Sequence, residues 1–449
     1  MVNLNRIMKT CRSLILLALL AHGLSAGISD VAGGNHHTYW IEDGIVYSTG
    51  QDLHKATGPS SYVGGKLGRP IDDKVLPEKD PDSMLARADY NPGPRPVRGL
   101  DGQTVVKVAS GQNDGAALTA GGLLFMWGPN DHGQLGLGDT KQRREAVRIP
   151  LPDGVRVRDV AIGNAHTLVL SEDGRVYGMG LNRNGVLGLG FREQVSVPTL
   201  IPGFEGKRVV AIAAAQNSHS LFLTAAGDLY GCGRNAAYAL ADVAAKGARV
   251  CRIVRIPTAE SFVAIGVGVR TSFAITAEGA LYAWGDGSKA HFARTLPGGS
   301  ADLSDLRRPT RIENAPPEIV EVAAGSRHTV VRTAGGDVYT WGIHTVLSGQ
   351  LGIGKPSAGE PGGIAGEVHA VPQQVGIPGD APAVSLDSMA NNVFLLTGDG
   401  AMYGWGSTAH GRLGGPVNAF DSAETVSGAT KYLAYEPVRL GKHSPARGK

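Results

Sequence analysis

The sequence is poor in the residues that several classes of protein require. Only 3 of its 449 residues are cysteine, too few for a disulfide framework in a chain of this size. Charged residues make up 18% and hydrophobic residues 42%, a balance that excludes wholesale disorder. Outside an apolar stretch at residues 14–21, no run approaches the roughly 20 residues of a membrane-spanning helix. Aromatic residues contribute 6%, so a core must be built mainly from aliphatic side chains.

Glycine, in contrast, is abundant. There are 65 glycines, about twice the usual share, together with 25 prolines. The glycines do not follow the three-residue period of collagen. Many glycines and prolines between short apolar runs predict many turns that join many short strands.

The first 26 residues have the pattern of a secretory signal peptide. Arg6, Lys9 and Arg12 precede the apolar run Leu14–Ala21, and Ala26 offers a small residue at the expected cleavage point. We therefore expect an exported protein, periplasmic or extracellular, with no membrane anchor after cleavage. The same three charges account for the whole formal net charge of +3, so the mature chain is expected to be neutral and not to bind nucleic acid. The basic residues of 442–449 are interpreted as a solvated tail.

Seven copies of one pattern fill residues 27–441. Each copy has a glycine, an aromatic residue three positions later and a second glycine three positions after that. Each copy is typical of two strands joined by a glycine hairpin, followed by an outer strand that often opens with proline. We predict one all-β domain, a seven-bladed β-propeller. The chain begins within a copy and ends on an outer strand, 436–440, so we expect this strand to serve the first copy and to close the ring by pairing of the N- and C-terminal strands. The predicted hairpin glycines are Gly44, Gly122, Gly174, Gly227, Gly279, Gly336 and Gly400.

A second motif follows the hairpin in several copies. It reads HGQLGLGD at 132–139, NGVLGLG at 184–190, SGQLGIG at 348–354 and HGRLGG at 410–415, with a shorter GGKLG at 64–68. On the sequence, copies four and five have lost this motif.

Together, the recurring G-x-x-H-T, G-x-V-Y-x-W-G and G-Q-L-G elements and the period of 50-odd residues resemble the repeat of the regulator of chromosome condensation family. The resemblance covers essentially all of residues 28–441 and implies the propeller fold. It also implies a guanine-nucleotide exchange factor for a small GTPase as one function. The chain departs from that function in its export signal, its lack of a basic tail to meet chromatin, and the near-minimal spacing of its third and fourth copies.

Four copies place a histidine at one shared position: His37, His166, His219 and His328. A ring of metal ligands is one interpretation, but the copies lie on different blades, and ligands must converge to about 2 Å from one ion. The other copies place Asp114, Thr271 and Asn392 there, which suits hydrogen bonding better than a uniform site. We interpret these histidines as structural, and we predict no metal, no cofactor and no catalytic residues.

Two cysteines remain after the leader. Cys232 stands where other copies have tryptophan, and Cys251 begins the next outer strand, which should be a neighbour in the sheet. We favour a disulfide between them because export is predicted, with two buried free thiols as the alternative.

Two insertions interrupt the repeats, at 51–94 and at 343–370. They are either surface loops without a role or loops that recognise a partner. Tyr62, Arg69, Tyr90 and Arg95 are the residues of the first insertion and its end that could anchor an interface, since Tyr and Arg are favoured there.

These observations predict a monomeric, exported, protein-binding propeller, an interaction module or inhibitor-like binder that uses loops on one face of the ring. The exchange factor is the first alternative. An exported enzyme with a site at the ring centre is the second, and no catalytic motif in the sequence supports it.

Overall fold

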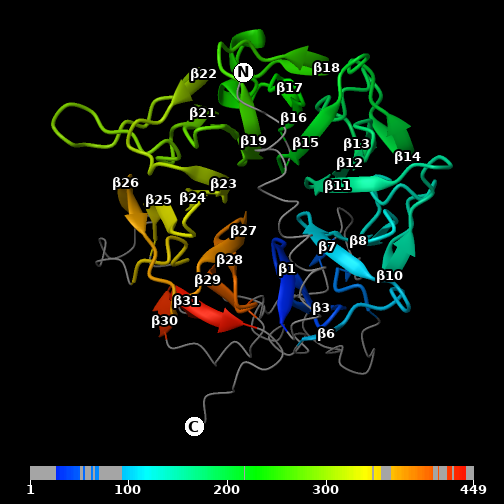
Figure 1. Cartoon of the computed structure of the whole chain (residues 1–449), viewed down its shortest axis with the longest axis horizontal. Coiled ribbons are helices and arrows are strands. Elements are labelled where there is room, and N and C mark those ends of the chain that lie inside the picture. The colour runs from blue at the N-terminus through cyan, green and yellow to red at the C-terminus, as the bar shows by residue number, and fades with distance from the viewer. Residues whose placement is uncertain are drawn as a thin grey trace, which may run out of the picture.

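The structure is a ring of seven small antiparallel sheets arranged around a common axis (Figure 1). It is a computed structural model that describes residues 27–50, 66–69, 94–216, 218–345, 348–354, 366–407, 413, and 422–440 apart from 427–428. The backbone of two short strands at 54–55 and 62–63 is also described, and 422–433 and 435 are described by backbone alone. The prediction of a seven-bladed β-propeller is confirmed.

Six of the sheets have four strands in chain order from the centre of the ring outward, and the seventh has a fifth strand, β30, at its outer edge beyond β31. The innermost strands are β1 Ile28–Gly33, β7 Val105–Ser110, β11 Val157–Ile162, β15 Val209–Ala214, β19 Phe262–Val267, β23 Ile319–Ala324 and β27 Ala383–Met389. The second strands are β2 His37–Glu42, β8 Gly115–Thr119, β12 His166–Ser171, β16 His219–Thr224, β20 Thr271–Thr276, β24 His328–Thr333 and β28 Asn392–Thr397.

The third strands contain the aromatic residue of the repeat. They are β3 Ile45–Gly50, β9 Leu124–Gly128, β13 Val176–Leu181, β17 Leu229–Arg234, β21 Leu281–Gly285, β25 Val338–His344 and β29 Met402–Ser407. The outer strands are β6 Arg95–Pro96, β10 Arg143–Arg148, β14 Gln194–Leu200, β18 Arg249–Arg255, β22 Leu306–Arg311, β26 Glu367–Gln374 and β31 Ala429–Leu440. The remaining elements are β4 His54–Lys55, β5 Tyr62–Val63, β30 Ser422–Val426 and the single-turn helices η3 Ala236–Tyr238 and η4 Ala241–Val243.

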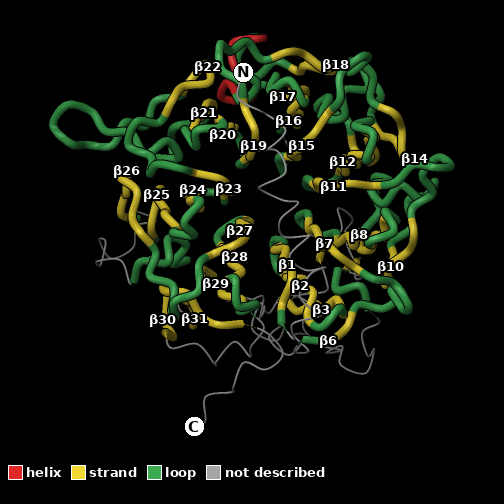
Figure 2. Tube along the Cα trace, viewed as in Figure 1, coloured by secondary structure: helices red, strands yellow, loops and turns green. Residues whose placement is uncertain are grey.

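The repeated glycines form the hairpins between second and third strands, as predicted. All seven have φ between 76° and 89°, a region that only glycine adopts at low cost. The second and third strands are buried almost throughout, because each sheet is covered on both faces by neighbouring blades. Figure 2 shows that almost all of the described ring consists of strands and the loops between them.

The prediction for how the ring closes is wrong. The last outer strand, β31, pairs with β29 in the seventh blade, and the first blade has its own outer strand, β6. Each blade is thus built from one continuous stretch of chain, because every outer strand follows its own copy in the sequence. The ring closes by packing of β1 against β27 and β28 and by a hydrogen bond from Ile28 N to Gly400 O (3.1 Å).

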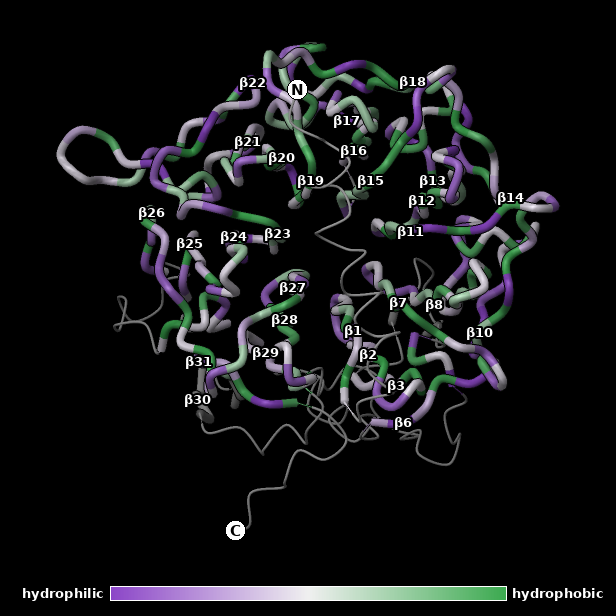
Figure 3. Tube along the Cα trace, in the orientation of Figure 1, coloured by the Kyte–Doolittle hydropathy of each residue, from purple (hydrophilic) through white to green (hydrophobic). Residues whose placement is uncertain are grey.

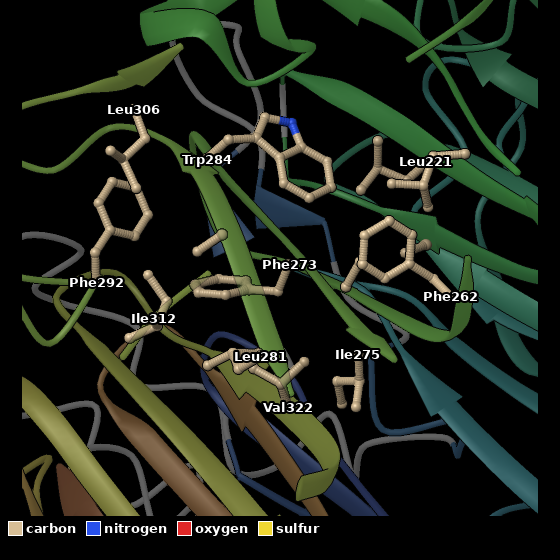
Figure 4. Packing of buried hydrophobic residues seen from close by; sticks show 14 of the residues in the cluster. Leu221, Phe262, Phe273, Ile275, Leu281, Trp284, Phe292, Leu306, Ile312 and Val322 are labelled. Atoms are coloured by element: carbon tan, nitrogen blue, oxygen red, sulfur yellow. The ribbon is translucent and has the colours of Figure 1, made fainter. Parts of the chain in front are cut away.

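The hydrophobic core lies between blades and not inside any one sheet. The largest cluster joins the fourth, fifth and sixth blades, and Figure 4 shows Phe273 at its centre with Trp284 and Leu281 on either side. Phe273 and Trp284 are completely buried. Burying one such aromatic side chain stabilises the fold by about 2–3 kcal/mol, so the contacts between blades account for much of the stability of the ring.

A repeated hydrogen bond fastens each of the first six blades to the next one. The loop after a third strand offers one backbone carbonyl, which accepts from a side chain of the following blade. For example, Trp284 Nε1 (2.9 Å) and Ser272 Oγ (2.7 Å) both donate to Ala239 O, and Trp341 Nε1 donates to His291 O (2.8 Å). The equivalent carbonyls belong to Lys66, Gln134, Val186 and Gln350. These are the residues before the leucine of the G-Q-L-G motif, so the motif serves blade contact.

Copies four and five keep this turn without its sequence. Leu240 and Phe292 are buried in place of the motif leucine. Tyr238 and Ala241 (φ 66° and 60°) and Ala290 and Ala293 (φ 57° and 48°) take the positive φ that Gly133 and Gly136 adopt in the second copy (72° and 70°). The turn is therefore present in these copies as structure, although the residues at all or most of the four motif positions differ.

An exposed residue with positive φ offers a direct test of backbone strain. Glu318 has φ 55° on the surface before β23. A side chain in this region costs about 1–2 kcal/mol, and a glycine costs about 0.5–1 kcal/mol in conformational entropy. Glu318→Gly should therefore raise the free energy of unfolding by about 0.5–1 kcal/mol in urea titrations. Glu313→Gly, in the same loop but at a position where φ is negative, is the matched control and should lower the free energy of unfolding. Equal effects of the two substitutions would contradict backbone strain at Glu318.

Candidate functional site

The two ends of the ring differ in the kind of connection they carry. Because the strands of a blade alternate in direction, the turns after innermost strands and the loops after third strands share one end, the loop face. The hairpins after second strands and the links between blades share the other end, the hairpin face. The loop face has the longer connections, such as 182–193, 235–248 and 286–305.

Among the described residues, the two faces carry opposite charge. The hairpin face has more acidic than basic residues, with Glu42, Asp43, Asp101, Asp153, Glu172, Asp173, Glu205, Asp228, Glu260, Glu278, Glu313, Glu318, Asp337, Asp380 and Asp399 against Arg98, Arg148, Arg156, Arg175, Lys207, Arg208, Arg255, Arg311 and Arg439. The exposed and half-buried residues of the loop face are more basic, with Lys141, Arg143, Arg183, Arg192, Arg234, Lys246, Arg249, Arg270, Lys289, Arg294 and Arg327 against Asp131, Asp139, Glu193, Asp242, Asp286, Asp302 and Asp305. A charged partner would therefore be oriented toward one face.

The innermost strands are polar on one side of the ring and apolar on the other. The third residue of each innermost strand is Asp30, Lys107, Asp159, Ala211, Ala264, Glu321 or Ser385. The strands β15 and β19 carry no charge, and Figure 3 colours them as hydrophobic along most of their length. No pair of general acid and base is formed here, because the described carboxylates are engaged in contacts between or within blades.

These contacts join the seventh blade to the first, where the ring closes, and the first three blades to one another. Asp387 Oδ2 accepts from Gly33 N (2.7 Å), Asp30 Oδ2 accepts from Val108 N (2.8 Å), and Lys107 pairs with Asp159. Burial raises the pKa of Asp387, while the bond from Gly33 N acts in the opposite direction. At the loop face, Gln216 Nε2 lies 2.8 Å from Met389 Sδ, so side chains of the fourth and seventh blades meet across the centre of the ring.

The four predicted histidines each lie between two blades. Their Nε2 atoms share hydrogen bonds with hydroxyl groups of the following blade: His37 with Ser110 (3.0 Å), His166 with Ser220 (3.4 Å), His219 with Ser272 (2.8 Å) and His328 with Ser388 (3.0 Å). All four side chains are buried. These rings are thus part of the contact between blades and are not aimed into a common space.

Burial keeps three of these imidazoles neutral. It lowers the pKa of His166 to about 4 and those of His219 and His328 to about 3. His291, in the loop whose carbonyl accepts from Trp341, is also buried, and its pKa falls to about 4. A neutral imidazole could hold a metal, but among the described residues no three His, Cys, Asp or Glu side chains lie close enough to bind one ion.

The second blade has Asp114 at the histidine position. Its carboxyl group is completely buried, and burial raises its pKa well above the usual value, although Gln134 and Lys66 act in the opposite direction. Lys66 is buried beside it under the first blade. This pair is enclosed, so it can stabilise the contact between blades but cannot meet a partner.

Cys232 and Cys251 lie on neighbouring strands of the fourth blade, β17 and β18, as expected, but both are free thiols in this structure. Cys232 Sγ donates to Val186 O (3.2 Å) and so replaces the tryptophan donor of other blades. Burial, with a smaller contribution from Cys251, raises the pKa of Cys232, which keeps it a thiol. The hydrogen bond to the third blade explains this cysteine without a disulfide.

The residues proposed as interface anchors are spread over different environments. Arg69 is buried, and its Nη2 donates to Ser48 O (3.4 Å), so it is not displayed at a surface. Arg95 is exposed in β6 at the outer rim. Tyr62 is placed only by the backbone of β5, and Tyr90 lies outside the described residues, as do most of the two insertions. Of the four, Arg69 and Arg95 both contact Ser48, whose carbonyl accepts from Arg69 and whose hydroxyl donates to Arg95 O (3.5 Å), while the side chains of Tyr62 and Tyr90 lie outside the described part of the chain.

Sequence reasoning missed the most exposed apolar side chain of the loop face. Phe191 lies near the end of the loop 182–193 of the third blade, next to Arg192, and its side chain is 86% exposed. A phenylalanine directly after the glycines of LGLG, where the second copy has aspartate, was the available signal. Among the described residues no helix is long and apolar enough to cross a membrane.

The model of the RCC1-like domain matches residues 64–434, most of the described ring. The chain belongs to the RCC1-like domain family. This RCC1-like propeller is 30% identical over 335 residues to the ultraviolet-B receptor UVR8 of Arabidopsis thaliana, covering 73% of this chain and 70% of that protein. It is also 30% identical over 308 residues to the secretion-regulating guanine nucleotide exchange factor of Mus musculus, and the match covers 66% of this chain and 62% of that protein.

Another relative contains the domain as a small part. The E3 ubiquitin-protein ligase HERC2 of Homo sapiens is 29% identical over 340 residues, which are 74% of this RCC1-like propeller but 7% of that protein. Solved structures agree in fold. Human WBSCR16 has a TM-score of 0.66 at 22% identity, covering 84% of this chain and 88% of that one. Yeast RCC1 (Prp20) bound to Kap60 has a TM-score of 0.61 at 22% sequence identity, and the match covers 80% of this chain and 78% of that one.

Proposed function

We propose that this RCC1-like propeller is an exported protein-binding module that engages its partner through the loop face. The observation that carries the proposal is the difference between the two faces: the loop face has the longer connections, excess positive charge and the protruding Phe191. The hairpin face is closed by short glycine turns and is acidic. Aromatic and arginine side chains on loops held by a rigid ring are typical of protein recognition.

Two kinds of evidence support binding over chemistry. The strongly shifted pKa values of His166, His219 and Asp114 belong to buried groups at the contacts between blades. The relatives include proteins named as an ultraviolet-B receptor and as a guanine nucleotide exchange factor, and neither name describes an enzyme that transforms a small substrate at the centre of a ring. A partner held with about 1,600 Å² of buried surface would need about half of that area from this ring.

Export is tested by fractionating the producing cells and reading the mature N-terminus by mass spectrometry. We expect a start near Gly27 in the periplasm or the medium. That mature form, immobilised, should then retain a defined exported protein with micromolar or tighter affinity in a direct titration. An intact Met1 in the cytosol would remove export from the proposal.

The exchange factor is the second candidate. It is favoured by 30% identity to a secretion-regulating guanine nucleotide exchange factor and by a 0.60 TM-score to Prp20p, whose structure was described with its binding to Gsp1p and histones. The test is release of labelled GDP from a panel of small GTPases in the presence of this chain. Acceleration by an order of magnitude or more for one GTPase would make exchange the preferred function.

A further inference from the structure

Five arginines lie on the loop that contains Phe191 and on the strands of the next blade that this loop contacts. Arg183 and Arg192 belong to the loop 182–193 of the third blade, while Arg234, Arg249 and Arg252 belong to the third and outer strands of the fourth. All five are exposed. These residues and Phe191 are called the arginine patch.

Backbone contacts hold the two halves of the arginine patch together. Gly190 N donates to Cys251 O (2.8 Å), and Leu189 forms a β-bridge with Arg252, so the residue before Phe191 is fixed to β18. Arg249 Nη1 donates to Arg183 O (3.2 Å), and Arg249 is the strand partner of Arg234. The arrangement is therefore built by the junction of two blades and does not depend on one mobile loop.

The arginines of this patch differ from those nearby in lacking acidic partners. Arg255 on the same outer strand pairs with Asp228 (2.6 Å), and Arg308 pairs with Asp242 (3.3 Å). Within the described part of the chain, none of the five patch arginines forms an ion pair, and Glu193 is the one acidic residue of the loop 182–193. Like charges held close together repel one another, and an anion that binds among them relieves that repulsion.

We infer that the arginine patch docks an acidic segment of the partner protein, with an apolar side chain of that segment packed on Phe191. This inference rests on the proposed function and names the chemistry of its partner. Guanidinium groups bind carboxylates with two parallel hydrogen bonds, and an exposed aromatic ring supplies an anchor that gains from being covered. An acidic protein segment offers both groups in one chain, whereas a duplex phosphate backbone offers no apolar side chain.

The test uses the full chain and a defined probe, a fluorescein-labelled 16-residue peptide of glutamate with two central leucines. Fluorescence anisotropy should show saturable binding that weakens from 50 to 300 mM NaCl. Phe191→Ala should weaken binding at least about fivefold, and Arg192→Ala with Arg249→Ala at least about tenfold with a reduced salt dependence. Lys207→Ala with Arg208→Ala, on the hairpin face, is the matched control and should leave binding unchanged.

Three further results would overturn the inference. The first is equal affinity for the same peptide with serine in place of leucine together with no effect of Phe191→Ala, which would show attraction to any polyanion. The second is tighter binding of a 16-nucleotide single-stranded DNA, which would assign the patch to nucleic acid. The third is an equal loss in the hairpin-face variant. The circular dichroism spectrum and thermal midpoint of every variant verify that the ring is folded.

The inference and the proposed function can fail separately. If a partner identified with the immobilised chain binds the Phe191 and arginine variants as tightly as the unaltered protein, the inference fails and the proposed function stands. If neither that search nor the acidic peptide gives saturable binding, both fail.

Discussion

Acidification from pH 7 to pH 4.5 is expected to unfold this propeller. His166, His219, His291 and His328 are buried, and their pKa values in the folded chain are about 4, 3, 4 and 3. In the unfolded chain they return to about 6.5, so unfolding takes up protons at any pH between these values. The stability they contribute is complete above about pH 6.5 and is lost as the pH falls toward 4.

The expected size of this effect is large. With four protons taken up, the free energy of unfolding should fall by about 5 kcal/mol per pH unit near pH 5, against a total of about 5–15 kcal/mol for a folded domain. The measurement is urea unfolding at half-unit steps from pH 7 to 5, followed by tryptophan fluorescence. A slope below about 1.4 kcal/mol per pH unit near pH 5, equivalent to one proton, would contradict it.

A matched variant isolates one histidine. The seventh blade has Asn392 at the histidine position, where Nδ2 donates to Ser407 O (2.6 Å), so asparagine is accepted at this site in the chain's own fold. His328→Asn should lower the stability at pH 7, because it loses the contact with Ser388. It should also reduce the pH slope by about 1.4 kcal/mol per unit, which a purely steric effect would not do.

Removal of one blade-fastening tryptophan is expected to be the most damaging single substitution. Trp341 is completely buried, and its Nε1 donates to His291 O (2.8 Å) in the preceding blade's loop. Trp341→Ala should lower the free energy of unfolding by about 3–5 kcal/mol through the cavity it leaves. The midpoint of urea unfolding at pH 7 measures this loss.

Trp341→Phe separates packing from hydrogen bonding. It keeps most of the apolar volume but removes the donor, while Thr329 Oγ1 still donates to the same carbonyl (3.2 Å). A loss of about 1–2 kcal/mol is expected, clearly smaller than for alanine. If phenylalanine and alanine were equally damaging, the hydrogen bond and not the packing would hold the blades together.

Much of the fold could be predicted from local sequence because the glycine hairpins impose it. Gly44 and its six equivalents need positive φ, and the spacing between them sets the number of blades. The diverged G-Q-L-G turns could not be predicted, since Tyr238 and Ala293 take positive φ only because the surrounding contacts require it. The closure was mispredicted because the last outer strand was assigned to the first copy, whereas each outer strand pairs with its own third strand.

The candidate site also combines features that local sequence predicts with features that only tertiary contacts create. Arg183 and Arg249 are 66 residues apart, and nothing in their local sequence relates them. They meet because the loop of one blade packs on the outer strand of the next. Arg69, by contrast, has the composition of an interface residue but is buried under the first blade.

The sequence by itself determined the repeat, the number of blades, the position of the histidines and the balance of charge. These depend on residue type and spacing, which the chain carries locally. Only the tertiary structure decided which carbonyl Trp284 and Trp341 reach, which face is basic and which arginines lie near the loop of Phe191. Those properties depend on how one blade packs against the next, and that packing joins residues 45 to 66 positions apart.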